Sequence, residues 1–244
     1  MDELFFHRMD DLARKSFCDG RVLFSDFLSE SECARLRAEK ARFSFCPPEL
    51  FGGAENCVRC VAKFGNAYEA AFPIACVCIT PKNKKYVSHF SHRDFLGAIL
   101  SLGLERSVIG DVVIFDDVGY CYCLAHIAPY LEEHLTSIGK TAVVCKRTEE
   151  RPSPVRNYRE ESTTVSSLRC DCIVCAVFHF SRAEALELFR NEKITLNGLP
   201  CSENAKELKE GDCVAVRGKG KLIVSAVGAL TKKERIRLCY KLPE

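Results

Sequence analysis

The sequence predicts an α+β protein with an N-terminal helical segment (residues 1–71), a central domain (72–148), a linker (149–165) and a C-terminal domain (166–244). Three observations predict this organisation. Apolar residues recur at helical spacing near the N-terminus, strand and helix patterns follow one another in the middle, and a polar stretch with two prolines precedes the last region. A chain of 244 residues suits two or three compact units rather than one.

The N-terminal segment carries two helix patterns. Apolar residues recur at helical spacing over residues 4–17, and the S-x-x-E sequence that starts at Ser29 is typical of a capping box at the beginning of a second helix. Residues 1–45 are therefore expected to be helical. Gly52–Gly53 then interrupts the pattern before a short predicted strand over residues 57–64.

The central domain follows the order strand, helix, strand, strand, helix, strand. Strand patterns cover residues 73–80, 111–115, 120–125 and 141–147, and helix patterns cover 92–103 and 128–139. The two middle strands are expected to turn near residues 117–119. This βαββαβ order is that of the split ferredoxin-like fold, so the domain is predicted to be RRM-like. The aromatic RNP pattern of true RRM domains is absent. Tyr120 and Tyr122 could stack on bases, but packing inside the domain is the favoured interpretation.

The C-terminal domain is predicted to contain two helices followed by a small curved sheet. The first helix lies within residues 166–180, and a second capping box starts the next helix at Ser181. A strand is expected to turn at Asn197–Gly198, and a hairpin over residues 214–224 is expected to turn at its glycines.

Positive charge is concentrated at this C-terminal end. The formal net charge of the chain is only +2, but residues 181–244 hold 13 Lys and Arg against 9 Asp and Glu, whereas the other 180 residues hold 22 against 24. A basic surface attracts phosphate groups, so the charge distribution favours a nucleic-acid partner for the C-terminal domain.

Sixteen cysteines raise the question of a disulfide framework or a metal site. Cys57 and Cys60 have the spacing of a zinc knuckle, but no second pair stands at a suitable distance. Cys170, Cys172 and Cys175 lie in an apolar helix pattern, where cysteine serves as a small hydrophobic residue. Reduced, buried thiols are therefore expected, with no stoichiometric metal and no cofactor. These three cysteines are the first candidates if a metal is found.

The predicted location is cytoplasmic. Residues 1–14 alternate charged and apolar residues, which is unlike a signal peptide, and no apolar run approaches the ~20 residues that span a bilayer. Many free thiols also indicate a reducing compartment.

The C-terminal domain resembles the S4-type RNA-binding domain, named after a ribosomal protein of the small subunit. The matching residues, in the expected order, are Leu168-Arg169-x-Asp171, Ser181-Arg182-x-x-Ala185, Ile194-x-Leu196-Asn197-Gly198, Gly211-Asp212 and Arg217-Gly218. They span about a quarter of the chain, which is far more specific than a single short motif.

Nearly the whole chain resembles the YlmH family. The residues that carry this resemblance are His92-Arg93-Asp94-Phe95-Leu96-Gly97-Ala98, Leu102-Gly103-Leu104, Ile109-Gly110-Asp111, Gly52-Gly53-Ala54-Glu55 and Thr231-Lys232-Lys233-x-Arg235. Two positions depart from the family pattern. Cys170 stands where the family usually has Leu, and Asn56 stands where it commonly has Arg.

The resemblance implies a non-catalytic factor that binds rRNA and tRNA on a large ribosomal subunit with an obstructed peptidyl-tRNA. Such binding would support tailing of the stalled chain in ribosome-associated quality control, with a looser link to cell division and no DNA specificity. The implied RNA-binding residues are Arg169, Ser181, Arg182, Lys193, Asn197, Arg217, Lys219, Lys221, Lys232, Lys233 and Arg235, and His92 and Arg93 are candidate contacts in the central domain.

Two other functions remain open at this point. One is an RNA-modifying enzyme with a site near His92, Arg93 and Asp94, and the other is a protein scaffold for cell division. The His-Arg-Asp sequence lacks the Asn that a kinase catalytic loop needs, because Ile99 occupies that position. Asp171 stands near Arg169 as in pseudouridine synthases, but an ion pair or a helix cap is the favoured interpretation.

Overall fold

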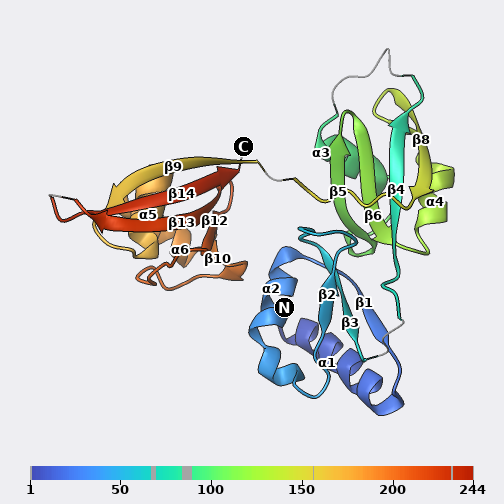
Figure 1. Cartoon of the computed structure of the whole chain (residues 1–244), viewed down its shortest axis with the longest axis horizontal. Coiled ribbons are helices and arrows are strands. Elements are labelled where there is room, and N and C mark those ends of the chain that lie inside the picture. The colour runs from blue at the N-terminus through green and yellow to red at the C-terminus, as the bar shows by residue number, and fades with distance from the viewer. Residues whose placement is uncertain (1, 67–69, 84–89, 156, 232, 244) are drawn as a thin grey trace. The chain divides into compact units, whose positions relative to one another are not determined.

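The structure is a computed structural model that describes residues 2–66, 70–83, 90–155, 157–231 and 233–243. The chain divides into two compact units, Met1–Val155 and Arg156–Glu244 (Figure 1). The described residues form six α-helices and three antiparallel sheets, which confirms the α+β class. None of the helices in these ranges combines the length and the apolar character needed to cross a membrane.

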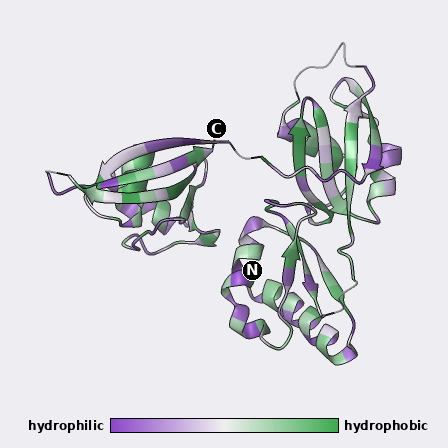
Figure 2. Cartoon of the chain, viewed as in Figure 1, coloured by the Kyte–Doolittle hydropathy of each residue, from purple (hydrophilic) through white to green (hydrophobic). Residues whose placement is uncertain are grey.

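The first unit begins with a small helix-and-sheet module. Its elements are α1 (Asp2–Asp19), β1 (Leu23–Leu28), α2 (Glu30–Ala38), the 3-10 helix η1 (Lys40–Phe43), β2 (Glu49–Phe51) and β3 (Cys60–Phe64). The strand order is β1-β3-β2, and Met9, Phe43 and Phe64 are buried between the sheet and α1. Both helices alternate apolar and polar colours in Figure 2, as amphipathic helices do. Ser29 caps α2 through a complete capping box, as predicted.

The expectation that residues 1–45 are helical is wrong for β1. Its backbone pairs with β3, from Leu23 opposite Phe64 to Leu28 opposite Cys60. The partner strand lies more than 30 residues further along the chain, so the helical periodicity on either side gave no indication of it. The N-terminal segment is therefore a sheet with helices and has a core of its own.

The second half of this unit has the predicted order of strands and helices. Its elements are β4 (Ile74–Pro81), α3 (His92–Leu100), the 3-10 helix η3 (Arg106–Val108), β5 (Ile109–Phe115), β6 (Val118–Leu124), α4 (Ala128–His134), β7 (Ser137–Ile138) and β8 (Thr141–Thr148). The strands lie in the order β5-β6-β4-β8-β7. One face of the sheet packs on α3 and α4 through Phe95, Ile99 and Leu131. Ser91 caps α3 in a capping box that Asp94 completes.

Two details of the central domain differ from the prediction. The β5–β6 turn is made by Asp116 and Asp117, whose φ angles are 46° and 64°, and Gly119 lies inside β6. Gly119 is needed for packing, because a Cβ there would lie 2.3 Å from the Phe95 ring. The second helix also ends at His134, five residues earlier than expected, because the chain then enters β7.

The second unit contains two helices and a six-stranded sheet. Its elements are β9 (Tyr158–Val165), α5 (Cys170–Phe178), α6 (Arg182–Arg190), β10 (Ile194–Leu196), β11 (Leu199–Pro200), β12 (Cys213–Val216), β13 (Gly220–Leu230) and β14 (Ile236–Pro243). The strand order is β11-β10-β12-β13-β14-β9. Asn197 and Gly198 both have positive φ angles, 51° and 82°, so the predicted turn between β10 and β11 is confirmed.

The predicted linker over residues 149–165 is wrong in its second half. Residues 158–165 form β9, which pairs along its whole length with β14, from Tyr158 opposite Pro243 to Val165 opposite Ile236. This strand is polar, and only Val165 in it is buried, so its sequence resembles a linker. Backbone pairing with a strand more than 70 residues away makes it part of the sheet.

Candidate nucleic-acid interface

A groove of about 770 Å³ lies in the second unit and contains three of the predicted RNA-binding residues. Arg169 precedes α5, Arg182 begins α6 and Arg235 precedes β14, and all three side chains line the groove. Its other lining residues are Val165, Ser166, Ser167, Asp171, Cys172, Cys175, Ala176, Leu186 and Asn204. We call this site the arginine groove. Its arginines suit a phosphate chain, and its apolar lining residues suit the flat faces of sugars or bases.

Arg182 is held at the start of α6 by the cap beside it. The Ser181 hydroxyl accepts a hydrogen bond from the Glu184 backbone N–H (3.2 Å), and the Ser181 N–H donates to the Glu184 carboxylate (2.8 Å). The same contact lowers the pKa of Glu184 below its ordinary value. The predicted N-cap at Ser181 is confirmed, and Arg182 is the exposed first residue of the helix. Since the cap occupies the Ser181 side chain, its contact with RNA stays a prediction.

Arg169 is fixed by a two-point ion pair with Asp171. Its Nε and Nη2 atoms donate to the two carboxylate oxygens at 3.0 and 2.6 Å. The carboxylate also accepts from the Cys172 N–H (2.8 Å) and from the Asn204 amide (3.0 Å). The hydrogen bond from Arg169 is the main cause that lowers the pKa of Asp171. The Arg169 side chain is still 44% exposed, so it remains open to a ligand.

Asp171→Asn should therefore weaken the fold of the second unit. Because the Asp171 pKa is depressed in the folded state, its contribution to stability is present above the ordinary carboxyl pKa and is lost as pH falls through the depressed value. We expect a loss of about 1 kcal/mol in the free energy of unfolding at pH 7. Urea unfolding of both proteins at falling pH checks this, and a difference that stays constant into strong acid would contradict it.

Arg235 connects the turn between β13 and β14 to the neighbouring strand β9. Its Nη2 donates to the Thr164 carbonyl of β9 at 2.6 Å, and its backbone N–H donates to the Thr231 hydroxyl at 3.1 Å. Lys233 is exposed in the same turn. Lys232, which was predicted to bind RNA together with them, lies outside the described residues.

Three further predicted residues form a second basic cluster at the hairpin tip, which we call the tip patch. Lys193 and Arg217 are neighbours, because the Lys193 carbonyl accepts from the Arg217 backbone N–H at 2.9 Å. The Lys219 ammonium lies 5.5 Å from the centre of the Phe180 ring, a cation–π distance. All three cations are exposed. None of them is among the described residues that line the arginine groove.

Asn197 has a structural task in the sheet. Its amide nitrogen donates to the Asp212 carboxylate and its amide oxygen accepts from the Cys213 N–H, both at 2.8 Å. Both ends of the side chain thus hold the β10–β11 turn against β12, and contact with RNA stays a prediction. Lys221 lies on β13 opposite Ala215, outside the groove lining.

The two candidate residues of the central domain lie in the other compact unit. His92 and Arg93 are the first two residues of α3, and both are exposed. Desolvation by the surrounding protein atoms, and next the nearby Arg106 guanidinium, lower the pKa of His92 although part of its ring is open to solvent. His92 and Arg93 therefore belong to the first unit, whereas the arginine groove belongs to the second.

Sequence reasoning missed a pair of arginines that connects the N-terminal module to the central domain. Arg59 donates to the carbonyls of Ile109 (3.0 Å), Phe27 (3.1 Å) and Arg106 (2.9 Å). Arg106 in turn donates to Ile109 (2.5 Å) and to the following glycine (2.9 Å). The available signal was Arg59 in the strand predicted over residues 57–64, where Lys63 is the other charged residue, but only the spacing of the flanking cysteines was weighed there.

The prediction of buried cysteines in the second unit is correct for Cys170 but not for Cys172 and Cys175. All sixteen are in the reduced state, and Cys170 is buried in the core of the second unit. Cys172 and Cys175 are only half-buried, because they face the arginine groove instead of the core. The Ser167 hydroxyl donates to the Cys172 sulfur at 3.3 Å. Among the described residues, no three His, Cys, Asp or Glu side chains converge as metal ligands.

Comparison with known proteins gives three matches. Residues 68–151 match the family model described as "Putative RNA-binding domain in YlmH". The curated "Ribosome-associated protein quality control protein P2" of Bacillus subtilis (strain 168) is 27% identical over 164 residues, which cover 65% of this chain and 64% of that protein. A solved structure, "Cell division protein ylmH from Streptococcus pneumoniae", has a TM-score of 0.48 at 15% identity and covers 60% of this chain and 90% of that one. The family model and the curated relative confirm the resemblance to the YlmH family, whereas the S4-type assignment stays a prediction.

Proposed function

Because the chain is related to the YlmH family, we propose that it is a non-catalytic factor that binds rRNA or tRNA on the large ribosomal subunit. It would act in the cytoplasm, in ribosome-associated quality control. The observation that carries this proposal is the arginine groove, which three arginine side chains line and which includes the first residue of α6. Guanidinium groups bind phosphates at two points, and helix N-termini attract anions, so the groove is suited to an RNA backbone. The name of the Bacillus subtilis relative supports the ribosomal context.

The proposal includes an RRM-like central domain and an S4-type C-terminal domain. The strand order β5-β6-β4-β8 supports the first, because it is the order in which a βαββαβ chain forms one antiparallel sheet. Two helices followed by strands β10 to β14, with Arg182 at the start of the second helix and Asn197 in the turn after β10, support the second.

A binding role is also supported by the state of the acidic group in the groove. Asp171 already accepts hydrogen bonds from Arg169, Cys172 and Asn204, so its oxygens are occupied and poorly placed to attack a base. We therefore propose that the factor leaves RNA chemically unchanged. Mass spectrometry of ribosomal RNA incubated with the chain should show unaltered nucleotides, and a mass change lost in Asp171→Asn or Asp94→Asn would reverse this conclusion.

The whole proposal is tested by sedimentation with large ribosomal subunits over a series of salt concentrations. Each phosphate contact releases a counterion, so the logarithm of the binding constant should fall linearly with the logarithm of the salt concentration. Four or more contacts from the arginine groove and the tip patch would give a slope of about −3 or steeper. Sedimentation that does not change between low and moderate salt would reject the electrostatic basis of the proposal.

A further inference from the structure

The sheet of the central domain has one face that the helices α3 and α4 leave open, and the N-terminal module covers half of it. Phe27 and Val61 of that module pack against Cys76 and Tyr122 of the sheet. Tyr122 is completely buried, and its hydroxyl donates to the Pro152 carbonyl at 2.9 Å. This half of the face is therefore closed to ligands.

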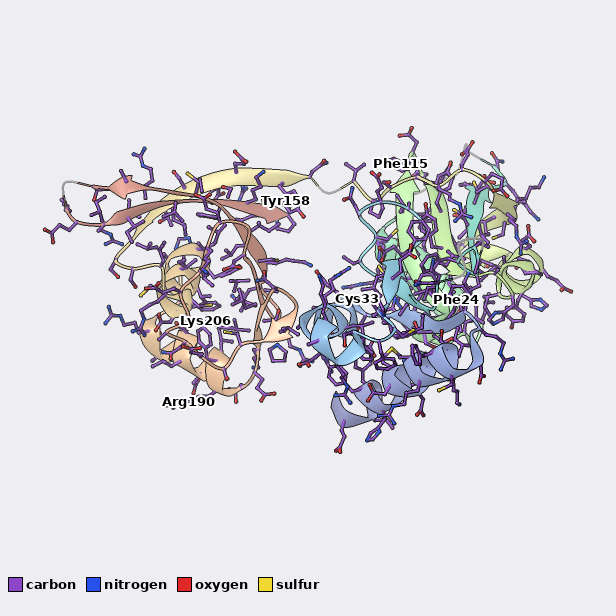
Figure 3. All side chains as sticks on the ribbon, turned by 60° about the horizontal axis from the view of Figure 1, so that its bottom comes forward. Phe24, Cys33, Phe115, Tyr158, Arg190 and Lys206 are labelled. Carbon is purple, nitrogen blue, oxygen red and sulfur yellow. The ribbon has the colours of Figure 1, made fainter. Side chains whose placement is uncertain are left out.

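The other half of the same face carries two aromatic rings and a cation, and Tyr120 is half-buried at the edge of the core that the module forms with the sheet. Tyr120 and Lys146 both pair with Cys78, from opposite sides of β4, so their side chains share one face of the sheet. Phe115, at the end of β5, is 41% exposed, and its ring centre lies 6.5 Å from that of Tyr120 at an angle of 69°. Figure 3 shows Phe115 at the rim of the sheet. Lys146 is exposed.

Glu150 holds the Tyr120 ring in place. Its carboxylate accepts a hydrogen bond from the Tyr120 hydroxyl at 3.1 Å. Burial and this contact raise the pKa of Tyr120 to about 12, so the ring is neutral near pH 7. Because the hydrogen bond already fixes the ring, little conformational entropy is lost when a flat group stacks on it.

We propose that Phe115, Tyr120 and Lys146 form a second RNA site, which binds unpaired nucleobases of a single-stranded segment. The site rests on the proposed RNA-binding function but is separate from the arginine groove. The family model that describes residues 68–151 as RNA-binding supports RNA as the occupant. Every nucleobase offers a flat face to aromatic rings, and Lys146 supplies a cation for the adjoining phosphate. Asp116 and Asp117 stand in the adjoining turn, so stacking and not charge should dominate the affinity.

Fluorescence gives a direct test, because the chain contains no tryptophan. In Phe115→Trp the new indole should be quenched, with saturation, by a single-stranded RNA of about ten nucleotides that forms no hairpin. The control is Tyr130→Trp. Tyr130 is similarly exposed (38%) but lies on α4, on the helical side of the same sheet, so its replacement should show no quenching. An unquenched indole at position 115 would overturn the inference.

Affinity measurements distinguish the contribution of the Tyr120 ring to binding from the contributions of its hydroxyl and of nearby charges. Tyr120→Leu should weaken binding of the same oligonucleotide roughly 5- to 100-fold, whereas Tyr120→Phe, which loses only the hydroxyl, should retain most of it. Neither change should alter the salt dependence, since stacking releases no counterions. Equal losses in both variants would mean that the ring does not stack. Thermal melts of the variants should match that of the parent chain.

The two RNA proposals fail in different experiments. If the indole at position 115 is unquenched while the chain still sediments with large subunits, this inference fails and the proposed function stands. If the indole is quenched by the single strand but the chain does not bind subunits, the proposed ribosomal function fails and this site stands. Arg182→Ala, which changes the other unit, should leave the quenching unchanged.

Discussion

Arg182→Ala should fold like the parent chain and bind large ribosomal subunits roughly ten- to a hundredfold more weakly. The side chain is exposed at the first position of α6, so its removal should change the free energy of unfolding by no more than about 0.5 kcal/mol. The loss of binding arises because a guanidinium beside free helix N–H groups makes a charge-assisted contact with phosphate. Arg182→Lys keeps the charge but lacks the two-point geometry, so it should restore binding only in part.

The same helix supplies a matched control. Arg190 is also an exposed arginine of α6, but it is the last residue of the helix and does not line the groove in the described structure. Arg190→Ala should sediment with subunits almost as the parent does, and Lys233→Ala should show an intermediate loss. The salt slope of Arg182→Ala should be smaller by about one contact. Subunit binding by Arg182→Ala as tight as that of the parent would show that α6 does not contact the RNA.

Features that depend on neighbouring residues could be predicted from the sequence. The capping boxes at Ser29 and Ser181 need only four consecutive residues, and the turn at Asn197 needs only a residue pair that tolerates positive φ angles. Each of them is present. Strands β1 and β9 were missed for the opposite reason, because each is stabilised by a partner that lies far along the chain.

The candidate sites show the same limit. Arg169 and Arg235 are 66 positions apart in the sequence and line one groove only because β14 pairs with β9. Tyr120 and Tyr122 alternate on one strand and point to the same face, so no local pattern distinguishes them. Tyr122 is completely buried and Tyr120 only half-buried, because the N-terminal module packs directly on Tyr122. Which tyrosine could meet a ligand is therefore decided by contacts between distant segments.

Gly53→Ala should destabilise the first unit by about 3 kcal/mol, because the added methyl group meets both backbone strain and a steric clash. Gly53 has a φ of +106°, which side-chain-bearing residues rarely adopt. A Cβ there would lie 2.4 Å from Cδ1 of the buried Tyr122 ring and 3.1 Å from Ile74. The ring cannot move away easily, because Phe27 packs against it and its hydroxyl is bound to a backbone carbonyl.

Gly103→Ala distinguishes the two causes of this loss of stability, which are the strained backbone and the clash with the Tyr122 ring. Gly103 also has a positive φ, +82°, but a Cβ there would meet nothing within 4 Å, so only the backbone term of about 1 kcal/mol should appear. In calorimetry the melting temperature of the first unit should fall by about 6–12 °C for Gly53→Ala and by about 2–4 °C for Gly103→Ala. Because the arginine groove belongs to the second unit, subunit binding at low temperature should persist in both variants. Equal melting temperatures for the two variants would mean that the Tyr122 ring yields to the extra methyl group and that the module is not locked onto the sheet at Gly53.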